Sequence, residues 1–323
     1  HTGQPYQPHR YVIYRASAPI VVDGHIDEKA WQDAEWTQPF EDAQSPYCPL
    51  PWKTTRAKIL HDDQALYFAA RLQEENVWAD IAKRDTISYW NNDFEIFVDP
   101  TADAVEYFEF EMTALNQMFD MWHENDNHRN ALADGRYDAP NIRHAVQVQG
   151  TLNYHHDVDT GWTVEVQWPW RAIAAHRPGR ILPPRRGQVF RMNFSRVQYE
   201  HDYSGLVCAR KPGPCEDWIW NSTNCGDLHM PEAWGRVFFT DQISGSEPDR
   251  DIEALASAPA LPRPAGLRRS VAVTVAARAD VPETRAPGPD TRAEHAPAGH
   301  GSASATAVSA AAVSATADTD DPG

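Results

Sequence analysis

The chain has 323 residues, of which 41% are hydrophobic and 23% charged, and 46 acidic against 29 basic residues give a formal net charge of −17. No apolar run approaches the roughly 20 residues of a membrane-spanning helix, and the negative charge would repel a phosphate backbone. We therefore expect neither a membrane span nor a nucleic-acid partner. The chain is nevertheless rich in flat rings, with 12 Trp, 11 Tyr and 11 Phe, which serve either a β-sandwich core or ligand stacking.

Alternation of apolar and polar residues dominates most of the chain and predicts about nine strands. These strands span residues 57–62, 66–73, 94–99, 107–112, 119–123, 145–152, 162–168, 189–197 and 234–239. Only residues 27–34 and 171–175 have a helical pattern, and both segments are short. Because so little helix is available for crossovers between parallel strands, the sequence predicts an all-β fold, an antiparallel, jelly-roll-like β-sandwich.

The composition changes at about residue 243. Residues 243–323 contain no Trp, Tyr, Phe, Cys or Lys and are rich in Ala, Pro, Ser and Thr. Such a segment buries too little apolar surface to offset the entropy that it would lose on ordering. We therefore predict one β-sandwich domain over residues 1–242 and a disordered tail or linker over residues 243–323.

The cysteines indicate an oxidising compartment. Cys208, Cys215 and Cys225 lie in one loop-like stretch, Cys48 is remote, and four cysteines allow three pairings between which the sequence does not choose. The spacing lacks the short pairs of a structural zinc site, so we expect two disulfides, with one bridge and two thiols as the alternative. The chain also begins at His1, as it would after removal of a signal peptide. Both features predict a secreted, periplasmic or cell-surface protein.

Six stretches carry a family resemblance, and they occur in the order VVDGHIDEKAWQDAEW, TTRAKILHDDQALYFAARLQEENVWA, NNDFEIFVDP, GTLNYHHDVDTGWTVEVQWPW, RMNFSRV and HMPEAWGRVFF. Together they resemble the family 9 carbohydrate-binding modules and the family 9-like proteins, over roughly residues 20–240. The resemblance implies a jelly-roll-like sandwich that binds a poly- or oligosaccharide, often at a chain end, between two Trp rings, commonly with structural calcium. Such a protein acts either alone or beside a partner polysaccharide-degrading enzyme.

Trp90 is the first candidate for a wall of the sugar site. It stands in a polar turn before the strand predicted over residues 94–99, where the family places a stacking Trp. Glu95 matches a family carboxylate that binds sugar hydroxyls. A pyranose ring offers an apolar face to an aromatic ring and hydroxyls to carboxylates and amides. The resemblance places the second wall near the C-terminus of the module, which points to Trp220 or Trp218.

The neighbours of Trp90 are further candidates. Asn91 and Asn92 would either bind ligand hydroxyls or only shape the turn. The family has a basic residue on the next strand, whereas this chain has Glu109 and Glu111 there. An acid-lined cleft would favour neutral sugars or hold calcium, and Arg196 would then supply the missing cation.

A second feature suggests calcium. Asp157 and Asp159 precede Gly161, and closely spaced carboxylates before a glycine turn are a common calcium geometry, because Ca²⁺ prefers several oxygen ligands. The same run would also suit an ordinary hairpin turn. We expect structural calcium at Asp157 and Asp159, with the turn at residues 23–27 as another source of ligands.

Copper chemistry is one enzymatic alternative. A mature N-terminal His1 chelates copper through its amino group and ring, and a second histidine such as His61, His123 or His229 would complete the site of a copper-dependent polysaccharide oxidase.

Two other functions use the predicted strands. A glycoside hydrolase needs two acids that face one scissile bond, which Glu95, Glu109 or Glu111 would supply. Haem-binding β-sandwiches need axial ligands, for which Met118, Met121 and His123 are available.

Overall fold

The computed structural model describes residues 7–45, 48–124, 132–134, 137–176, 182–203, 209–211 and 215–258. Its helices are α1 (Lys29–Asp33), α2 (Trp170–His176) and α3 (Arg250–Ser257), and two short 3-10 turns are η1 (Ser88–Trp90) and η2 (Pro231–Ala233). Within these ranges, no helix has the length and apolar character needed to cross a bilayer.

One large sheet dominates the fold, and 13 of the described strands belong to it. Most of the sheet runs in the order β8-β7-β6-β5-β11-β15-β1-β3-β4-β10-β9, while β14 pairs with β11 and β2 pairs with β14. The strands of the sheet are β1 (Arg10–Arg15), β2 (Glu41–Asp42), β3 (Thr55–His61), β4 (Ala65–Gln73), β5 (Asp93–Asp99), β6 (Tyr107–Thr113), β7 (Met118–Glu124), β8 (Leu132–Asp134), β9 (Arg143–Gln149), β10 (Gly161–Pro169), β11 (Val189–Gln198), β14 (Glu216–Ile219) and β15 (Gly235–Ile243). A separate ribbon consists of β12 (His201–Asp202) and β13 (Ala209–Arg210).

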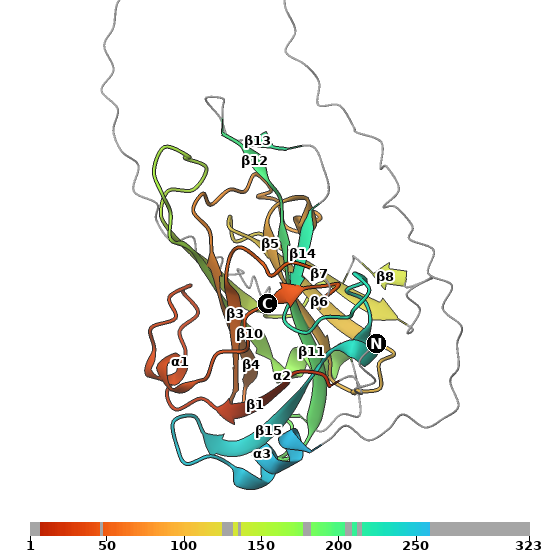
Figure 1. Ribbon diagram of the computed structural model, residues 1–323. Helices are drawn as coiled ribbons and strands as arrows, with labels where there is room; N and C mark the ends of the chain where they lie inside the picture. The colour runs from red at the N-terminus through yellow and green to blue at the C-terminus, as the bar shows by residue number, and fades with distance from the viewer. Residues whose placement is uncertain are drawn as a thin grey trace, which may run out of the picture. The chain divides into compact units, whose positions relative to one another are not determined.

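The sheet curls back on itself and encloses the main core (Figure 1). Phe68 of β4 packs edge-on against Phe194 of β11 with ring centroids 6.0 Å apart, and Trp168 of β10 meets Phe110 of β6 at 4.9 Å. These strands are not neighbours in the sheet, so the contacts join two halves that pack face to face. The predicted β-sandwich is confirmed, and a single curled sheet builds it.

Strand β5 shows how alternation separates apolar from acidic side chains. Phe94, Ile96 and Val98 belong to the main core, whereas Asp93 and Glu95 point to the opposite face because successive side chains alternate. That outer face is covered as well, since every residue of β5 is buried. A second, smaller apolar cluster lies on it, formed by Ala43, Phe97, Tyr107, Ile219, Leu228 and Trp234.

Each of the nine predicted strands is present, with shifts only at the ends. The sheet is mixed rather than wholly antiparallel, however, because β1 runs parallel to both β15 and β3. We expected parallel pairing to require helical crossovers. The largely irregular segment over residues 16–54 is long enough to return the chain to the same end of the sheet without one.

The predicted boundary at residue 242 also needs correction. Residues 243–258 were expected to be disordered, but β15 ends at Ile243 and α3 follows it. Ile252 and Ala256 of α3 are buried against Phe238 of β15. The helix is amphipathic, so a few apolar residues suffice to dock it on an existing sheet. The rest of the predicted tail lies outside the described residues.

The predicted disulfides are not formed among the described cysteines. Cys48, Cys215 and Cys225 are not joined to one another. Cys208 lies outside the described residues.

Candidate functional site

Trp90 presents an exposed ring on a firmly held turn. The residue is 43% exposed and ends η1. The backbone N–H groups of Ser88 and Tyr89 donate to Glu111 Oε2 at 3.0 and 3.2 Å, and the carbonyl of Trp90 accepts a hydrogen bond from Arg210 of β13 at 3.0 Å. The turn and the ribbon thus hold the backbone of Trp90 while part of its ring stays open to solvent.

The two asparagines beside Trp90 are buried and build this loop. Asn91 Oδ1 accepts the backbone N–H groups of Asp80 and Ile81 at 2.8 and 3.0 Å, and its amide donates to the Asp80 carboxylate at 2.9 Å. Asn92 Oδ1 accepts the N–H of Tyr199 at 2.8 Å. Of the two roles considered from the sequence, the structure supports turn shaping for both residues.

Trp218 and Trp220 lie in the interior, which argues against the stacking role expected for them. Trp218 is 1% exposed and Trp220 is fully buried. The Trp220 indole N–H donates to Gln38 at 3.0 Å, and a Cβ on Gly235 would come within 2.3 Å of its ring. Both rings pack in the core because β14 and the residue after it lie against β11, so neither offers a face to a ligand.

The sequence analysis missed a second exposed ring, Trp52. It is 56% exposed and packs edge-on against Trp218 with ring centroids 4.7 Å apart. Its setting between Pro51 and Lys53, in a polar and proline-rich loop, is the same kind of signal that singled out Trp90. Of the 12 Trp residues, all of which are described, only Trp52 and Trp90 are exposed.

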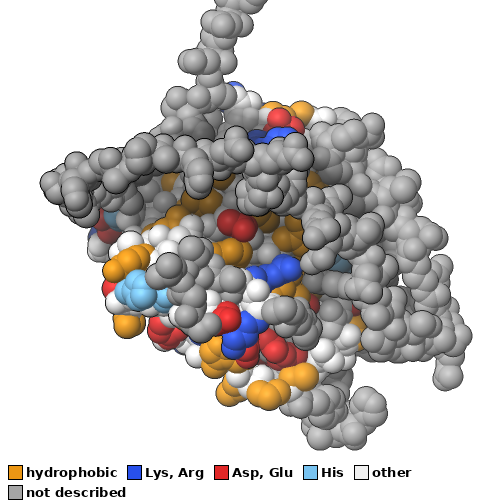
Figure 2. Space-filling model, turned by 90° about the horizontal axis from the view of Figure 1, so that it is seen from above, with side chains coloured by type: hydrophobic (Ala, Val, Ile, Leu, Met, Phe, Trp, Pro, Cys, Tyr) orange, Lys and Arg blue, Asp and Glu red, His pale blue; other side chains and the backbone are white. Residues whose placement is uncertain are grey.

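Both exposed rings lie near the C-terminal end of β11. Trp218, against whose ring Trp52 packs, pairs with Arg196 of β11. Tyr199 follows β11, and its ring lies under Arg210, the residue that binds the Trp90 carbonyl. Seen from above the β12–β13 ribbon, hydrophobic side chains lie beside charged ones of both signs (Figure 2). We call the surface formed by Trp52, Trp90, Tyr199 and Arg210 the Trp end.

Arg196 is a structural residue rather than a ligand-binding cation. Its guanidinium is fully buried and makes five hydrogen bonds, which equals the number of its N–H donors. The acceptors are Thr55, the Gln73 carbonyl, Glu74 and Gln198, the last of which accepts twice. No donor is left for a sugar, so the expectation that Arg196 replaces the family's basic residue is wrong in this structure.

Glu95 lies in a cluster of buried acids on the outer face. One oxygen each from Asp93, Glu95 and Glu111 lies within 4.8 Å of the others. Glu95 accepts a hydrogen bond from the hydroxyl of Ser195, while Asp93 Oδ2 has no partner among the described residues. Burial, followed by the neighbouring Glu95 carboxylate, raises the pKa of both Asp93 and Glu111 well above the ordinary range.

These three carboxylates fit calcium better than the predicted aspartate run does. Asp159 uses both oxygens to accept backbone N–H groups, of Thr151 at 2.7 Å and of Val77 at 2.6 Å, and Asp157 accepts from the Thr151 hydroxyl. Neither aspartate belongs to a group of three close ligand atoms among the described residues. The run therefore closes a loop in this structure. His1 lies outside the described residues, and so does any copper site that would include it.

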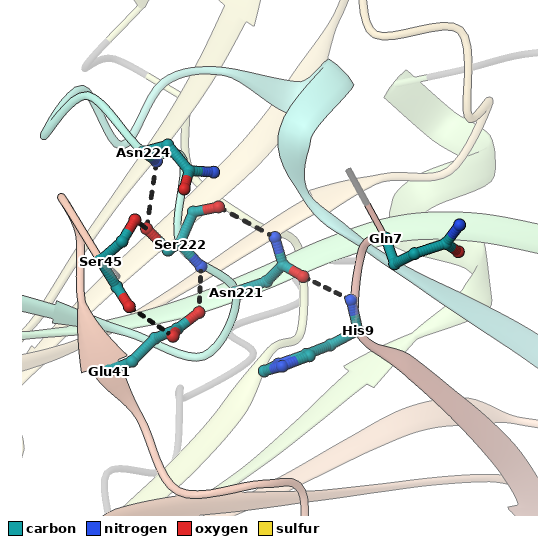
Figure 3. A pocket seen from close by; sticks show the side chains of 7 residues that line it. All are labelled: Gln7, His9, Glu41, Ser45, Asn221, Ser222 and Asn224. Carbon is teal, nitrogen blue, oxygen red and sulfur yellow. Dashed lines mark hydrogen bonds between the residues drawn. The ribbon is translucent and has the colours of Figure 1, made fainter. Parts of the chain in front are cut away.

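A small polar pocket of about 110 Å³ opens between the N-terminal segment and the loop after β14 (Figure 3). Its polar groups bind each other: Glu41 accepts from the Ser222 N–H at 3.0 Å and from the Ser45 hydroxyl at 2.8 Å, and Asn221 accepts from the N–H of His9. No Trp, Tyr or Phe ring lines it. The pocket therefore offers hydrogen bonds but lacks the apolar platform that a pyranose face requires.

Comparison with known proteins identifies the family. The model of the carbohydrate family 9 binding domain-like proteins matches residues 22–190, more than half of the chain. No curated protein gives a significant match. Among solved structures, a proposed carbohydrate-binding protein from Bacteroides uniformis is 14% identical with a TM-score of 0.55, and the alignment covers 72% of this chain and all of that one.

A family 9 carbohydrate-binding module from Caldicellulosiruptor kristjanssonii, solved with cellotriose, is 17% identical with a TM-score of 0.48 and aligns with 78% of this chain and all of its own. A family 9 module from the same organism, solved with glucose, has the same identity and TM-score and aligns with 74% of this chain and all of its own. The match to the family model agrees with the resemblance seen in the sequence and with the curled β-sandwich. The chain belongs to the carbohydrate family 9 binding domain-like family.

Proposed function

We propose that the protein binds a neutral oligosaccharide without catalysis at the Trp end, with the ring of Trp90 as the stacking platform. The observation that carries this proposal is the combination of an exposed indole with a backbone held by Glu111 and Arg210. A platform whose backbone is already held loses less entropy when a sugar stacks on it. Trp52 is the second exposed ring of this surface and the candidate for the opposite wall.

The charge of the chain favours neutral sugars. The net charge of −17 would repel the carboxylates of uronic acids. Calcium is part of the same proposal: Asp93, Glu95 and Glu111 would hold it. The bound cation would compensate their charges, and Glu111 would continue to hold the turn that carries Trp90.

Calorimetric titration of the full chain with glucose, cellobiose, xylobiose and laminaribiose, with calcium and with EDTA, tests the proposal. We expect saturable binding of at least one sugar and a loss of at least about tenfold in affinity for Trp90→Ala, because stacking and burial of a ring contribute about 1.4 kcal/mol or more. Trp36→Ala is the matched control, since its ring packs instead against Lys58 and Arg71.

Two results would contradict the proposal. If the wild-type chain binds none of these sugars, carbohydrate binding at the Trp end is refuted for these ligands. If a sugar binds and Trp90→Ala binds it equally well, the platform is not Trp90. Circular dichroism of each variant shows whether the sandwich is intact.

A further inference from the structure

A second group of possible metal ligands lies on the outer face, next to the calcium candidate, because its Glu109 stands two residues before Glu111 on β6. Glu109 of β6 and His123 of β7 lie on adjacent strands, where Tyr107 pairs with His123 and Glu109 pairs with Met121. Glu109 and His123 are therefore diagonal neighbours on the same face. His229, in the loop before η2, reaches the same place from a distant part of the chain.

The three side chains converge on one point. One donor atom from each lies within 4.8 Å of the other two. Glu109 Oε2 is hydrogen-bonded to His123 Nε2 and lies 3.9 Å from His229 Nδ1, and the two imidazole centroids are 5.2 Å apart. Tetrahedral donors at about 2.1 Å from zinc lie roughly 3.4 Å apart. A closure of about 0.5 Å would bring Glu109 Oε2 and His229 Nδ1 to this separation, whereas the shorter Glu109–His123 hydrogen bond would open.

The surroundings allow this closure. The side chains of Glu109 and His123 are 3% and 4% exposed, whereas that of His229 is 40% exposed. Glu109 and His123 are thus buried, whereas the half-exposed His229 leaves a route from solvent. Tyr107 stacks on His123 with ring centroids 4.3 Å apart, and its hydroxyl lies 2.8 Å from His229 Nδ1. A metal ion bound to Nδ1 would replace this hydrogen bond.

One imidazole nitrogen of this group has no partner among the described residues. His123 Nδ1 is buried and has no hydrogen-bond partner among the described residues. Buried polar side-chain atoms are usually paired, so the contact with Glu109 leaves this imidazole only partly satisfied.

We propose that Glu109, His123 and His229 bind a divalent transition-metal cation of the zinc class. Two imidazoles and one carboxylate are a donor set that suits zinc and its transition-metal neighbours, whereas calcium prefers an all-oxygen site. Three protein ligands leave a fourth position for water or a ligand oxygen. Among the contacts described, none of these three ligands contacts Trp90 or holds its turn, so the two sites are tested separately through His229.

Zinc titration of the EDTA-treated full chain by calorimetry tests the site. We expect saturable binding that His229→Ala weakens by more than about tenfold, which is the smallest loss expected when even an outer-shell partner is removed. His229→Ala is chosen because the side chain is half exposed and its removal leaves the buried Glu109 and His123 unchanged. Glu109→Gln keeps the size of the side chain but removes its charge, and it should weaken zinc binding as well.

Controls separate this site from other histidines. His156→Ala removes an exposed imidazole elsewhere in the chain and should leave zinc binding at the site unchanged. His1→Ala removes the terminal imidazole, which is a competing metal ligand. The proposal is overturned if the wild-type chain does not bind zinc, or if His229→Ala and Glu109→Gln bind it as the wild type does. Sugar titration of His229→Ala is expected to match the wild type, so failure of this site and failure of the sugar platform are distinguishable.

Discussion

Glu95 of β5 and Glu111 of β6 face each other directly across adjacent strands, and both carboxyl groups are buried. Like charges at such a position destabilise a sheet, and burial increases the cost. Asp93 lies close to both and shares their surroundings. The fold tolerates this arrangement when protons or a cation compensate the charge.

The pH dependence of stability should report on this pair. The pKa of Glu111 is raised in the folded state, so the folded protein keeps a proton that the unfolded chain releases above about pH 4.5. The folded state then binds more protons than the unfolded state, and stability falls as the pH rises through this window. Gln does not titrate, so Glu111→Gln should lose less free energy of unfolding than the wild type between about pH 5 and pH 8.

Urea unfolding at a series of pH values measures this difference. Calcium should raise the wild-type melting temperature at about pH 8 more than that of Glu111→Gln, because the variant offers one carboxylate fewer. Parallel pH curves for the two proteins would show that Glu111 does not carry the proton.

Arg196 should matter for stability rather than for sugar affinity. Its removal would leave Glu74, which is 2% exposed, without the cation on one of its oxygens. Breaking a buried ion pair on one side costs about 3–5 kcal/mol, so Arg196→Met should lower the free energy of unfolding by about this amount. Arg171→Ala on α2 is the matched control, because Arg171 is exposed and should cost less than about 1 kcal/mol. If Arg196→Met is stable but has lost sugar binding, Arg196 binds the sugar and this prediction is wrong.

The aspartate run allows a direct test of loop closure against calcium binding. Asp159→Ala removes the acceptor of two backbone N–H groups and should cost about 1–3 kcal/mol, because buried donors lose their partner. Asp157 is exposed and bonds only a threonine hydroxyl among the contacts described, so Asp157→Ala should cost less than about 1 kcal/mol. Thermal unfolding with calcium and with EDTA should show the same difference between the variants. A difference that appears only with calcium would place the ion at this run.

Trp90 shows what local pattern contributes to finding a site. Its polar turn before a strand predicts an exposed ring, and the structure places it on the surface. The same reasoning applied to the proline-rich loop before residue 55 would also have identified Trp52. The stacking role predicted for Trp220 is wrong. Its sequence context is equally polar, but β11 and Gly235 bury its ring.

The sequence by itself determined the strands and the sandwich class, because alternation of side chains requires no more than the local order of residues. Its ordered motifs carried the resemblance to the family. Only the tertiary structure decided the parallel pairing of β1, the docking of α3 and the burial of Arg196. It also decided which acids and histidines meet on the outer face. Alternation predicts the face of the sheet toward which Glu109 or His123 points, but it does not predict which residues cover that face. That depends on contacts such as the one with His229, which lies far away in the sequence and reaches this face only through the fold.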